Sequence, residues 1–298
     1  MATMRDIKRR KESINSTQQI TKAMKLVATV KLQKSKTQAE QASPYFLNMF
    51  RTVQSSLERT GKISHPYLDG KADGKKAVVL ITSNRGLAGG YNINAGKLIT
   101  DGDFSKEDTL VFCIGKKGRE YVERRGYQVM AEESDVMNNP LYSDAISICS
   151  RLLEKFQQGE INEIYIAYTF FKNTVVHEPT LLQLLPLGNE ETEKAADSTD
   201  DQNTEPEDPY EKLTLMNYEP SEEEVLDLII PKYITSILYG ALMQALASEN
   251  GARMQAMDAA TSNAQDMIDD LSLQYNRARQ GSITQELTEI IAGAEALE

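Results

Sequence analysis

The residues with the clearest chemical potential form a glycine-rich stretch, Ser83 to Asn92, which reads SNRGLAGGYN and directly follows an apolar run. A glycine-rich loop between a strand and a helix can bind phosphate through backbone amides. The phosphate-binding loop of nucleoside triphosphatases ends in Gly-Lys-Ser/Thr, whereas Gly90 is followed by Tyr-Asn, and the dinucleotide fingerprint G-x-G-x-x-G is also missing. We therefore expect a tight structural turn in which Asn92 caps the next helix, with nucleotide binding as the alternative. The predicted turn residues are Arg85, Gly86, Gly89, Gly90 and Asn92.

The remaining reactive residue types are sparse. Cys113 and Cys149 lie far apart in apolar surroundings, which is typical of buried, reduced thiols rather than of a disulfide. His65 and His177 have no Cys or His at metal-ligand spacing, so zinc is not expected. No carboxylate pair or nucleophile–base set accompanies the glycine-rich stretch. The sequence predicts no catalytic residue, no cofactor site and no metal site.

Charge is distributed unevenly along the 298 residues. The net charge is −11, yet residues 1–60 carry +8 and residues 187–227 carry −13. A basic segment can indicate nucleic-acid binding, but here no aromatic residues alternate with the charges. We favour a basic helix that lies along an acidic helix or along acidic partner subunits, and keep a nucleic-acid-binding coiled-coil adaptor as an alternative.

A long helix is predicted at the N-terminal end. Residues 1–43 contain neither Gly nor Pro, and the segment 45–60 is expected to continue the helix after a kink at Pro44. Ile20, Met24 and Val27 suggest an apolar stripe along it. Residues 1–43 alone would span roughly 65 Å at about 1.5 Å per residue, and so long a helix needs a partner.

A second long helix is predicted at the C-terminal end. Ser221 and the glutamates after it form an acidic N-cap region, and no Pro follows Pro231. An apolar stripe at steps of three and four predicts that the terminal helices pair as an antiparallel coiled coil, with Met24 and Val27 packed against residues 254–273. The stripe comprises Met254, Met257, Thr261, Ala264, Met267, Ile268, Leu271 and Tyr275.

The middle of the chain alternates between strands and helices. Strands are expected at 77–82, 109–114, 127–131, 161–171 and 174–187, and helices at 92–100, 116–125 and 141–157. This alternation predicts an α/β domain with a mostly parallel sheet. The predicted organisation is an N-terminal coiled-coil helix at 1–60, a central α/β domain at 75–230 with a solvated acidic insertion at 188–209, and a C-terminal coiled-coil helix at 231–298.

Direct membrane insertion is not expected. The most apolar stretch, residues 234–247, is too short for a bilayer and is interrupted by Ser236 and Gln244. The first residues are polar and basic, unlike a signal or transit peptide, which favours a bacterial protein.

Three motifs together resemble the gamma subunit of F-type ATP synthases. They are ITKAMKLVA at 20–28, SNRGLAGGYN at 83–92 and ITQELTEI at 283–290, and the match covers nearly the whole chain in order. The resemblance implies a coiled coil of the terminal helices plus a central Rossmann-like α/β domain. It also implies a non-catalytic central rotor shaft that couples ion flow through the membrane c-ring to ATP synthesis or hydrolysis at the beta subunits. The shaft would lie at the cytoplasmic face of the cell membrane as a peripheral protein.

The resemblance also implies partners for individual residues. The partners would be the alpha and beta subunits, the epsilon subunit and the c-ring, with the coupling ion, H⁺ or Na⁺, selected in the c-ring. Tyr218 and Glu219 match the foot that rests on the c-ring. The last residues, 290–297, would turn in an apolar bearing. The residues expected to contact beta subunits are Lys22, Met24, Lys25, Arg253, Arg279, Gln280, Thr284 and Glu286.

The sequence departs from the family pattern at a few positions. Many relatives have Cys where this chain has Ala88 and Asp where it has Asn84, and the regulatory Cys pair of chloroplast members has no counterpart. The acidic stretch from Gly188 to Pro209 is longer than the family leads us to expect. It is either an inert loop or a species-specific latch.

Overall fold

The computed structural model describes residues 4–59, 65–69, 74–187, 219 and 221–295. The chain divides into two compact units, which we name the coiled-coil unit (Met1–Thr29 with Arg253–Glu298) and the α/β unit (Val30–Ala252). The long helices α1 (Met4–Arg59) and α7 (Glu222–Glu295) each contribute residues to both units. Both predicted terminal helices are thus confirmed.

Both long helices contain a proline that the sequence analysis used as a landmark. Pro44 lies inside α1, and Pro231, the expected domain boundary, lies inside α7. The start of α7 is set upstream by Ser221, whose hydroxyl accepts a hydrogen bond from the Glu224 N–H at 3.3 Å. This is the N-cap that the acidic sequence predicted, and it stabilises the first turn by satisfying an otherwise free amide.

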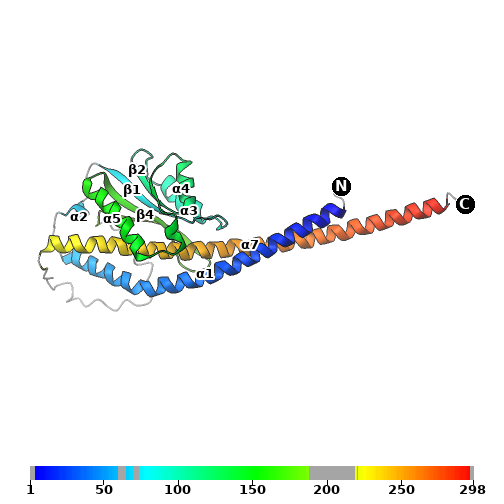
Figure 1. Ribbon diagram of the computed structural model, residues 1–298, viewed down its shortest axis with the longest axis horizontal. Helices are drawn as coiled ribbons and strands as arrows, with labels where there is room; N and C mark the ends of the chain where they lie inside the picture. The colour runs from blue at the N-terminus through cyan, green and yellow to red at the C-terminus, as the bar shows by residue number, and fades with distance from the viewer. Residues whose placement is uncertain (1–3, 60–64, 70–73, 188–218, 220, 296–298) are drawn as a thin grey trace. The chain divides into compact units, whose positions relative to one another are not determined.

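The α/β unit contains a five-stranded sheet in the order β3-β2-β1-β4-β5 (Figure 1). The first four strands pair in parallel, and β5 pairs with β4 in antiparallel fashion. The predicted α/β class with a mostly parallel sheet is confirmed. The strands are β1 (Lys75–Ile81), β2 (Thr109–Ile114), β3 (Gln128–Glu132), β4 (Ile161–Phe171) and β5 (His177–Leu185).

Helices connect the strands at the places the sequence predicted. The α helices are α2 (Pro66–Asp69), α3 (Tyr91–Thr100), α4 (Lys116–Glu123) and α5 (Tyr142–Gln158), and a short 3₁₀ helix, η1, covers Asp135–Asn138.

The β1 strand is buried on both faces, which explains its continuous apolar run. Val79 belongs to a hydrophobic cluster shared with α5 and with the part of α7 in this unit, whereas Val78 belongs to a second cluster shared with α3 and α4. Both side chains are fully buried. Because neighbouring side chains of a strand point to opposite faces, the two clusters lie on opposite sides of the sheet.

In the coiled-coil unit, α1 and α7 lie side by side (Figure 1), and the hydrogen bonds between them define an antiparallel register. Gln18 bonds Gln265 at 2.8 Å, Thr21 bonds Thr261 at 2.8 Å, and Lys25 bonds Asp258 at 2.6 Å. Each step forward on α1 is a step backward on α7. The antiparallel pairing of the terminal helices is confirmed.

The α1 side of the contact differs from the prediction. Ile20 and Val27 are 60% and 58% exposed, while Thr21 and Ala28 are 9% and 2% exposed. The residues facing α7 repeat at intervals of seven from Ile7, so the contact follows a heptad. The predicted packing of Val27 against α7 is wrong, because the largest apolar residues on this stretch of α1 lie outside the heptad positions.

The α7 side of the contact agrees with the predicted stripe except at one position. Met257, Ala264 and Leu271 are buried, whereas Met267 is 54% exposed. Residues that face α1 follow one another at intervals of three and four from Met254 to Leu271, and Ile268 is one of them. Met267 is therefore on the outer side of α7. Small residues in this contact let the two backbones approach closely.

Candidate functional site

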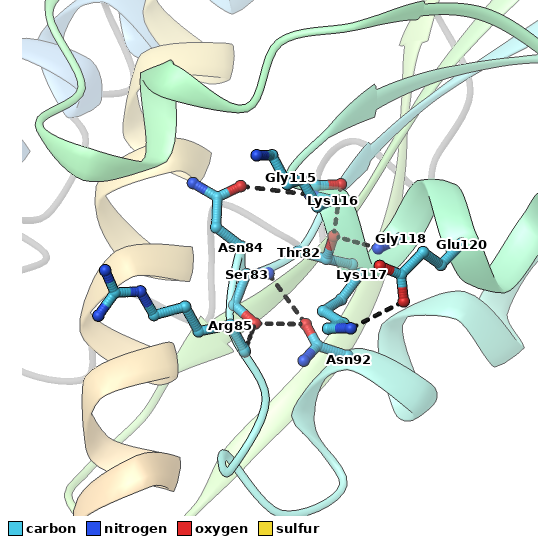
Figure 2. Close-up of polar contacts among 10 residues, drawn as sticks. All are labelled: Thr82, Ser83, Asn84, Arg85, Asn92, Gly115, Lys116, Lys117, Gly118 and Glu120. Carbon is cyan, nitrogen blue, oxygen red and sulfur yellow. Dashed lines mark hydrogen bonds and ion pairs between the residues drawn. The ribbon is translucent and has the colours of Figure 1, made fainter. Parts of the chain in front are cut away.

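The predicted structural turn follows β1 and is held by side-chain contacts that lead back to the strand end (Figure 2). The carboxamide oxygen of Asn92 accepts hydrogen bonds from the Ser83 N–H and from the Ser83 hydroxyl, both at 2.9 Å. The expected capping role of Asn92 is wrong, because α3 begins at Tyr91 with Gly90 as its N-cap and no side-chain cap bond. Asn92 instead ties the first turn of α3 to the end of β1.

The same turn accepts hydrogen bonds from the N-terminal backbone amides of α4, the neighbouring helix. The Lys116 N–H donates to the Asn84 side-chain oxygen at 3.2 Å, and the Gly118 N–H donates to the Thr82 hydroxyl at 2.8 Å (Figure 2). The intervening Lys117 N–H donates to the Ser83 carbonyl at 3.1 Å. Free amides at a helix N-terminus would bind a phosphate. Here the first three are already bonded within the protein, so they are not free to bind a phosphate, whereas the nucleotide alternative concerned the loop before α3.

The close backbone approach in this region involves glycines other than those predicted. A Cβ at Gly115 would lie 2.1 Å from the Thr82 carbonyl oxygen, and Gly115 has a φ of +103°. A Cβ at Gly118 would lie 2.5 Å from the Thr82 hydroxyl oxygen. Gly86, by contrast, has nothing within 4 Å. Sequence reasoning missed Gly115 because its only signal was its position between β2 and α4.

The two cysteines confirm the prediction of buried thiols. Cys113 and Cys149 are free and buried. Burial raises the pKa of each thiol to about 12. Both are therefore protonated at neutral pH and are unreactive as nucleophiles or metal ligands. Within the described ranges, no group of His, Cys, Asp and Glu side chains has a metal-binding arrangement.

The residues expected to contact beta subunits lie on both helices of the coiled-coil unit. Lys22 is exposed and Met24 is half-buried. Lys25 is in an ion pair with Asp258 of α7 at 2.6 Å, and the two side chains are 38% and 61% exposed. The charge of Lys25 therefore has a partner within the chain, although an exposed pair of this kind can exchange partners at little cost.

Four further predicted residues lie together near the end of α7. Arg279, Gln280, Thr284 and Glu286 are exposed. The Thr284 hydroxyl donates to the Gln280 carbonyl at 2.9 Å, and Glu286 accepts a bond from Ser282 at 3.4 Å. Arg253 is 26 residues before Arg279 on the same helix, roughly 39 Å along its axis. Arg279, Gln280, Thr284 and Glu286 therefore lie close together on α7, whereas Arg253 lies far from them along the same helix.

An exposed apolar surface lies on the end of α7 and begins upstream of residue 290, where the apolar bearing was expected to start. All residues from 283 to 293 are exposed, although the segment is helical. The hydrogen bonds between the helices place Met4, the first described residue of α1, opposite about residue 279 of α7. The segment 283–293 therefore extends beyond the described part of α1. The large apolar residues on this segment are Ile283, Leu287, Ile290 and Ile291.

Two further predictions concern the foot and the acidic insertion. Tyr218 and the whole of 188–209 lie outside the described residues, and Glu219 is exposed.

By length and composition alone, α7 is apolar enough to cross a membrane. Half of its apolar stretch is, however, buried inside the protein. Ile234, Leu238 and Leu242 belong to the large hydrophobic cluster of the α/β unit. The apolar character of this part of α7 is explained by its place in the core.

Comparisons with known proteins agree with this architecture. The family model described as ATP synthase matches residues 3–297. The chain is 62% identical to the ATP synthase gamma chain of Lachnoclostridium phytofermentans, with 100% of both chains covered. It is 42% identical to the sodium-ion-specific gamma chain of Acetobacterium woodii, over 99% of this chain and 98% of that one.

Solved structures show the same fold at low identity. A chain of the mitochondrial ATP synthase of Euglena gracilis matches with a TM-score of 0.64 at 18% identity, covering 99% of this chain and 94% of that one. A central-stalk and c-ring structure from Tetrahymena thermophila matches with a TM-score of 0.57 at 24% identity, covering 81% and 99%. The chain therefore belongs to the family of ATP synthase gamma chains.

Proposed function

We propose that this gamma chain works as the central rotor shaft of a bacterial F-type ATP synthase and has no catalytic site of its own. In this proposal, ion flow through the membrane c-ring turns the shaft, and the shaft changes the conformation of the beta subunits that make or hydrolyse ATP. The relatives that share its full length carry the name ATP synthase gamma chain, which supports the assignment.

The observation that carries the proposal is the exposed apolar end of α7. A single helix that exposes Ile283, Leu287 and Ile290 to water is marginal, because isolated helices gain little stability without packing. Ile283, Leu287, Ile290 and Ile291 are spaced i, i+4, i+7 and i+8, so they form one apolar stripe along the helix, and an exposed stripe of this kind suits packing against an apolar partner surface. The alpha and beta subunits would provide such a surface.

The polar residues near this end suit contacts that form and break during rotation. Gln280 can both donate and accept hydrogen bonds, and Arg279 can bond a carboxylate. Because Arg253 lies roughly 39 Å from Arg279 along α7, the two arginines would meet different beta-subunit segments. Lys22, Met24 and Lys25 would contact a beta subunit from α1, while Thr284 and Glu286 would join the cluster around Gln280.

Two observations support the proposed absence of catalysis. The backbone amides at the start of α4 are already bonded within the protein, and the thiols of Cys113 and Cys149 are protonated. Nucleotide chemistry would then belong to the beta subunits. The remaining proposed partners are the alpha subunits, the epsilon subunit and the c-ring, with Tyr218 and Glu219 at the c-ring foot. The complex would lie at the cytoplasmic face of the cell membrane, with the insertion 188–209 serving either as an inert loop or as a latch on hydrolysis.

Reconstitution with alpha and beta subunits tests the proposal. Replacing Ile283, Leu287 and Ile290 with Ser should reduce assembly and steady-state ATP hydrolysis, because their apolar contacts with the ring are lost. The matched control replaces Gln285 and Glu289, exposed residues of the same segment, with Ser, and should assemble normally.

Two results would contradict the proposal. Normal assembly and wild-type hydrolysis in the apolar triple variant would show that this surface is not enclosed by the ring. Micromolar nucleotide binding by the isolated chain would favour the alternative of a nucleotide-binding α/β protein.

A further inference from the structure

A polar junction joins the β4–β5 hairpin to α7 within the α/β unit. The Ser248 hydroxyl donates to the Thr169 carbonyl at 3.0 Å, and the Phe171 N–H donates to the Gln244 side-chain oxygen at 3.3 Å. We name this set the hairpin junction, and it comprises Thr169, Phe171, His177, Gln244, Ser248 and Gly251.

His177 occupies the tightest place in the hairpin junction. A Cβ at Gly251 would lie 2.6 Å from the imidazole Cε1 and 3.1 Å from Nε2, so the ring packs directly on the glycine of α7. Its other neighbour is the Phe171 ring, with centroids 5.7 Å apart. The absence of a side chain at Gly251 therefore makes room for this imidazole.

The His177 side chain is half-buried, but its ring nitrogens are packed against the protein. Both His177 ring nitrogens are inaccessible to water and have no hydrogen-bond partner among the described residues, and the same is true of the Thr169 hydroxyl. Burial lowers the pKa of His177 because the charged form loses hydration. A protonated imidazole at this position would hold two buried N–H donors with nothing to accept them.

Among the described residues near the ring, no carboxylate is free to compensate for such a charge. Lys172 and Glu178, beside the ring on the hairpin, pair with each other at 3.3 Å. Glu249 of α7 is buried and has an interaction of its own. Protonation of His177 is therefore favoured only when the ring leaves the junction.

We propose that the hairpin junction is an acid-sensitive clamp, closed while His177 is neutral and opened when protonation draws the imidazole into water. The direction follows from linkage, since the open form binds the extra proton more readily. The clamp is fully closed above the ordinary His pKa of about 6.5 and weakens as pH falls below it. The hairpin would then loosen from α7 when the surrounding solution acidifies.

Hydrogen exchange of the full-length chain tests the clamp. Protection factors, corrected for the intrinsic effect of pH, should fall for amides of 168–178 and 244–251 between pH 7.5 and pH 5.5. Because a single proton is involved, the protection factors can fall at most tenfold for each pH unit. Amides of β3, at the edge of the sheet opposite to the β4–β5 hairpin, provide the internal reference.

Two substitutions remove the titrating group in different ways. His177→Phe replaces the unpartnered nitrogens with carbon, and His177→Gln keeps a neutral polar group, so each should make protection independent of pH whatever its baseline. His65→Phe is the control, because His65 is buried and both its nitrogens have partners, the Tyr67 N–H at 3.3 Å and Asp227 at 3.4 Å. That variant should retain the pH dependence of the hairpin junction.

A direct titration completes the test. The NMR midpoint of His177 should lie below the ordinary value and should move toward it in Gly251→Ala, whose added methyl group displaces the ring. An ordinary midpoint in the wild type, or unchanged pH dependence in both His177 variants, would overturn the proposal.

Discussion

The two units of this chain differ in how many large side chains they bury completely. The largest fully buried residues, such as Phe112 and Phe156, belong to the α/β unit, whereas the coiled-coil unit buries Thr21 and Ala28 of α1 beside Met257 and Leu271 of α7. Large side chains bury far more apolar area than small ones, so the α/β unit gains more stability from its own packing. The coiled-coil unit instead leaves Ile20, Val27 and the end of α7 exposed, and these surfaces are available to partners.

The largest expected effect comes from truncating the α/β core. Phe156→Ala should destabilise the chain by about 3–5 kcal/mol, because the fully buried ring leaves a cavity. Val175→Ala is the control, since Val175 is 70% exposed and its replacement should change stability by less than about 0.5 kcal/mol. Urea unfolding of both variants measures the difference. Equal stability would mean that the core of the α/β unit does not carry its fold.

The second prediction separates two glycines of the turn region. Gly115→Ala should cost about 1–3 kcal/mol, because a Cβ would meet the Thr82 carbonyl at 2.1 Å and the φ of +103° is strained for alanine. Gly86→Ala meets nothing within 4 Å and should be nearly neutral. Urea unfolding of the two variants measures the contrast, and a neutral Gly115→Ala would show that the β2–α4 connection can shift.

The third prediction compares adjacent residues of α1. Ala28→Leu should weaken the coiled-coil contact by about 1–3 kcal/mol, because Ala28 is 2% exposed and the added carbons have no space. Val27→Leu adds a carbon at a position that is 58% exposed and should change little. Exchange protection of amides in residues 254–272 reports the contact. Similar protection in both variants would refute the heptad register.

Much of the fold was predictable, because strand–helix alternation and helix-compatible composition are strong local signals. The apolar run at 77–82 identified β1, and the acidic segment after Ser221 identified the start of α7. The face of α1 was not predictable from hydrophobicity alone. Ile20 and Val27 of the predicted stripe are exposed and Met24 is only half-buried, since the α1 side of the contact with α7 places Thr21 and Ala28 inside.

The turn after β1 shows a different limit. Its glycines were conspicuous, and Gly89 does adopt a positive φ of +56°, yet the closest backbone approach falls on Gly115, which is distant in sequence. Asn92 was also expected to cap the helix beside it in sequence, whereas its carboxamide oxygen accepts a hydrogen bond from the Ser83 N–H. The local motif predicted a tight turn after β1. The contacts of this turn with the start of α4 depend on the pairing of β1 with β2, which cannot be predicted from a local pattern.

The smallest expected effect belongs to the Lys25–Asp258 ion pair, the best-defined charged contact between the helices of the coiled-coil unit. A double-mutant cycle with Lys25→Ala and Asp258→Ala should give a coupling of about 0–1 kcal/mol, because both side chains are substantially exposed to water. The coupling should shrink between 0.1 M and 1 M salt, where the screening length falls from about 10 Å to about 3 Å. Lys36→Ala and Glu40→Ala, an exposed pair within α1, provide a matched control for helix-internal effects. In the reconstituted complex, Lys25→Ala should therefore weaken ATP-driven ion pumping only mildly. Complete loss of pumping at normal assembly would show that Lys25 bonds a partner more strongly than it bonds Asp258, and that this face of the coiled-coil unit is a principal contact rather than a weak one.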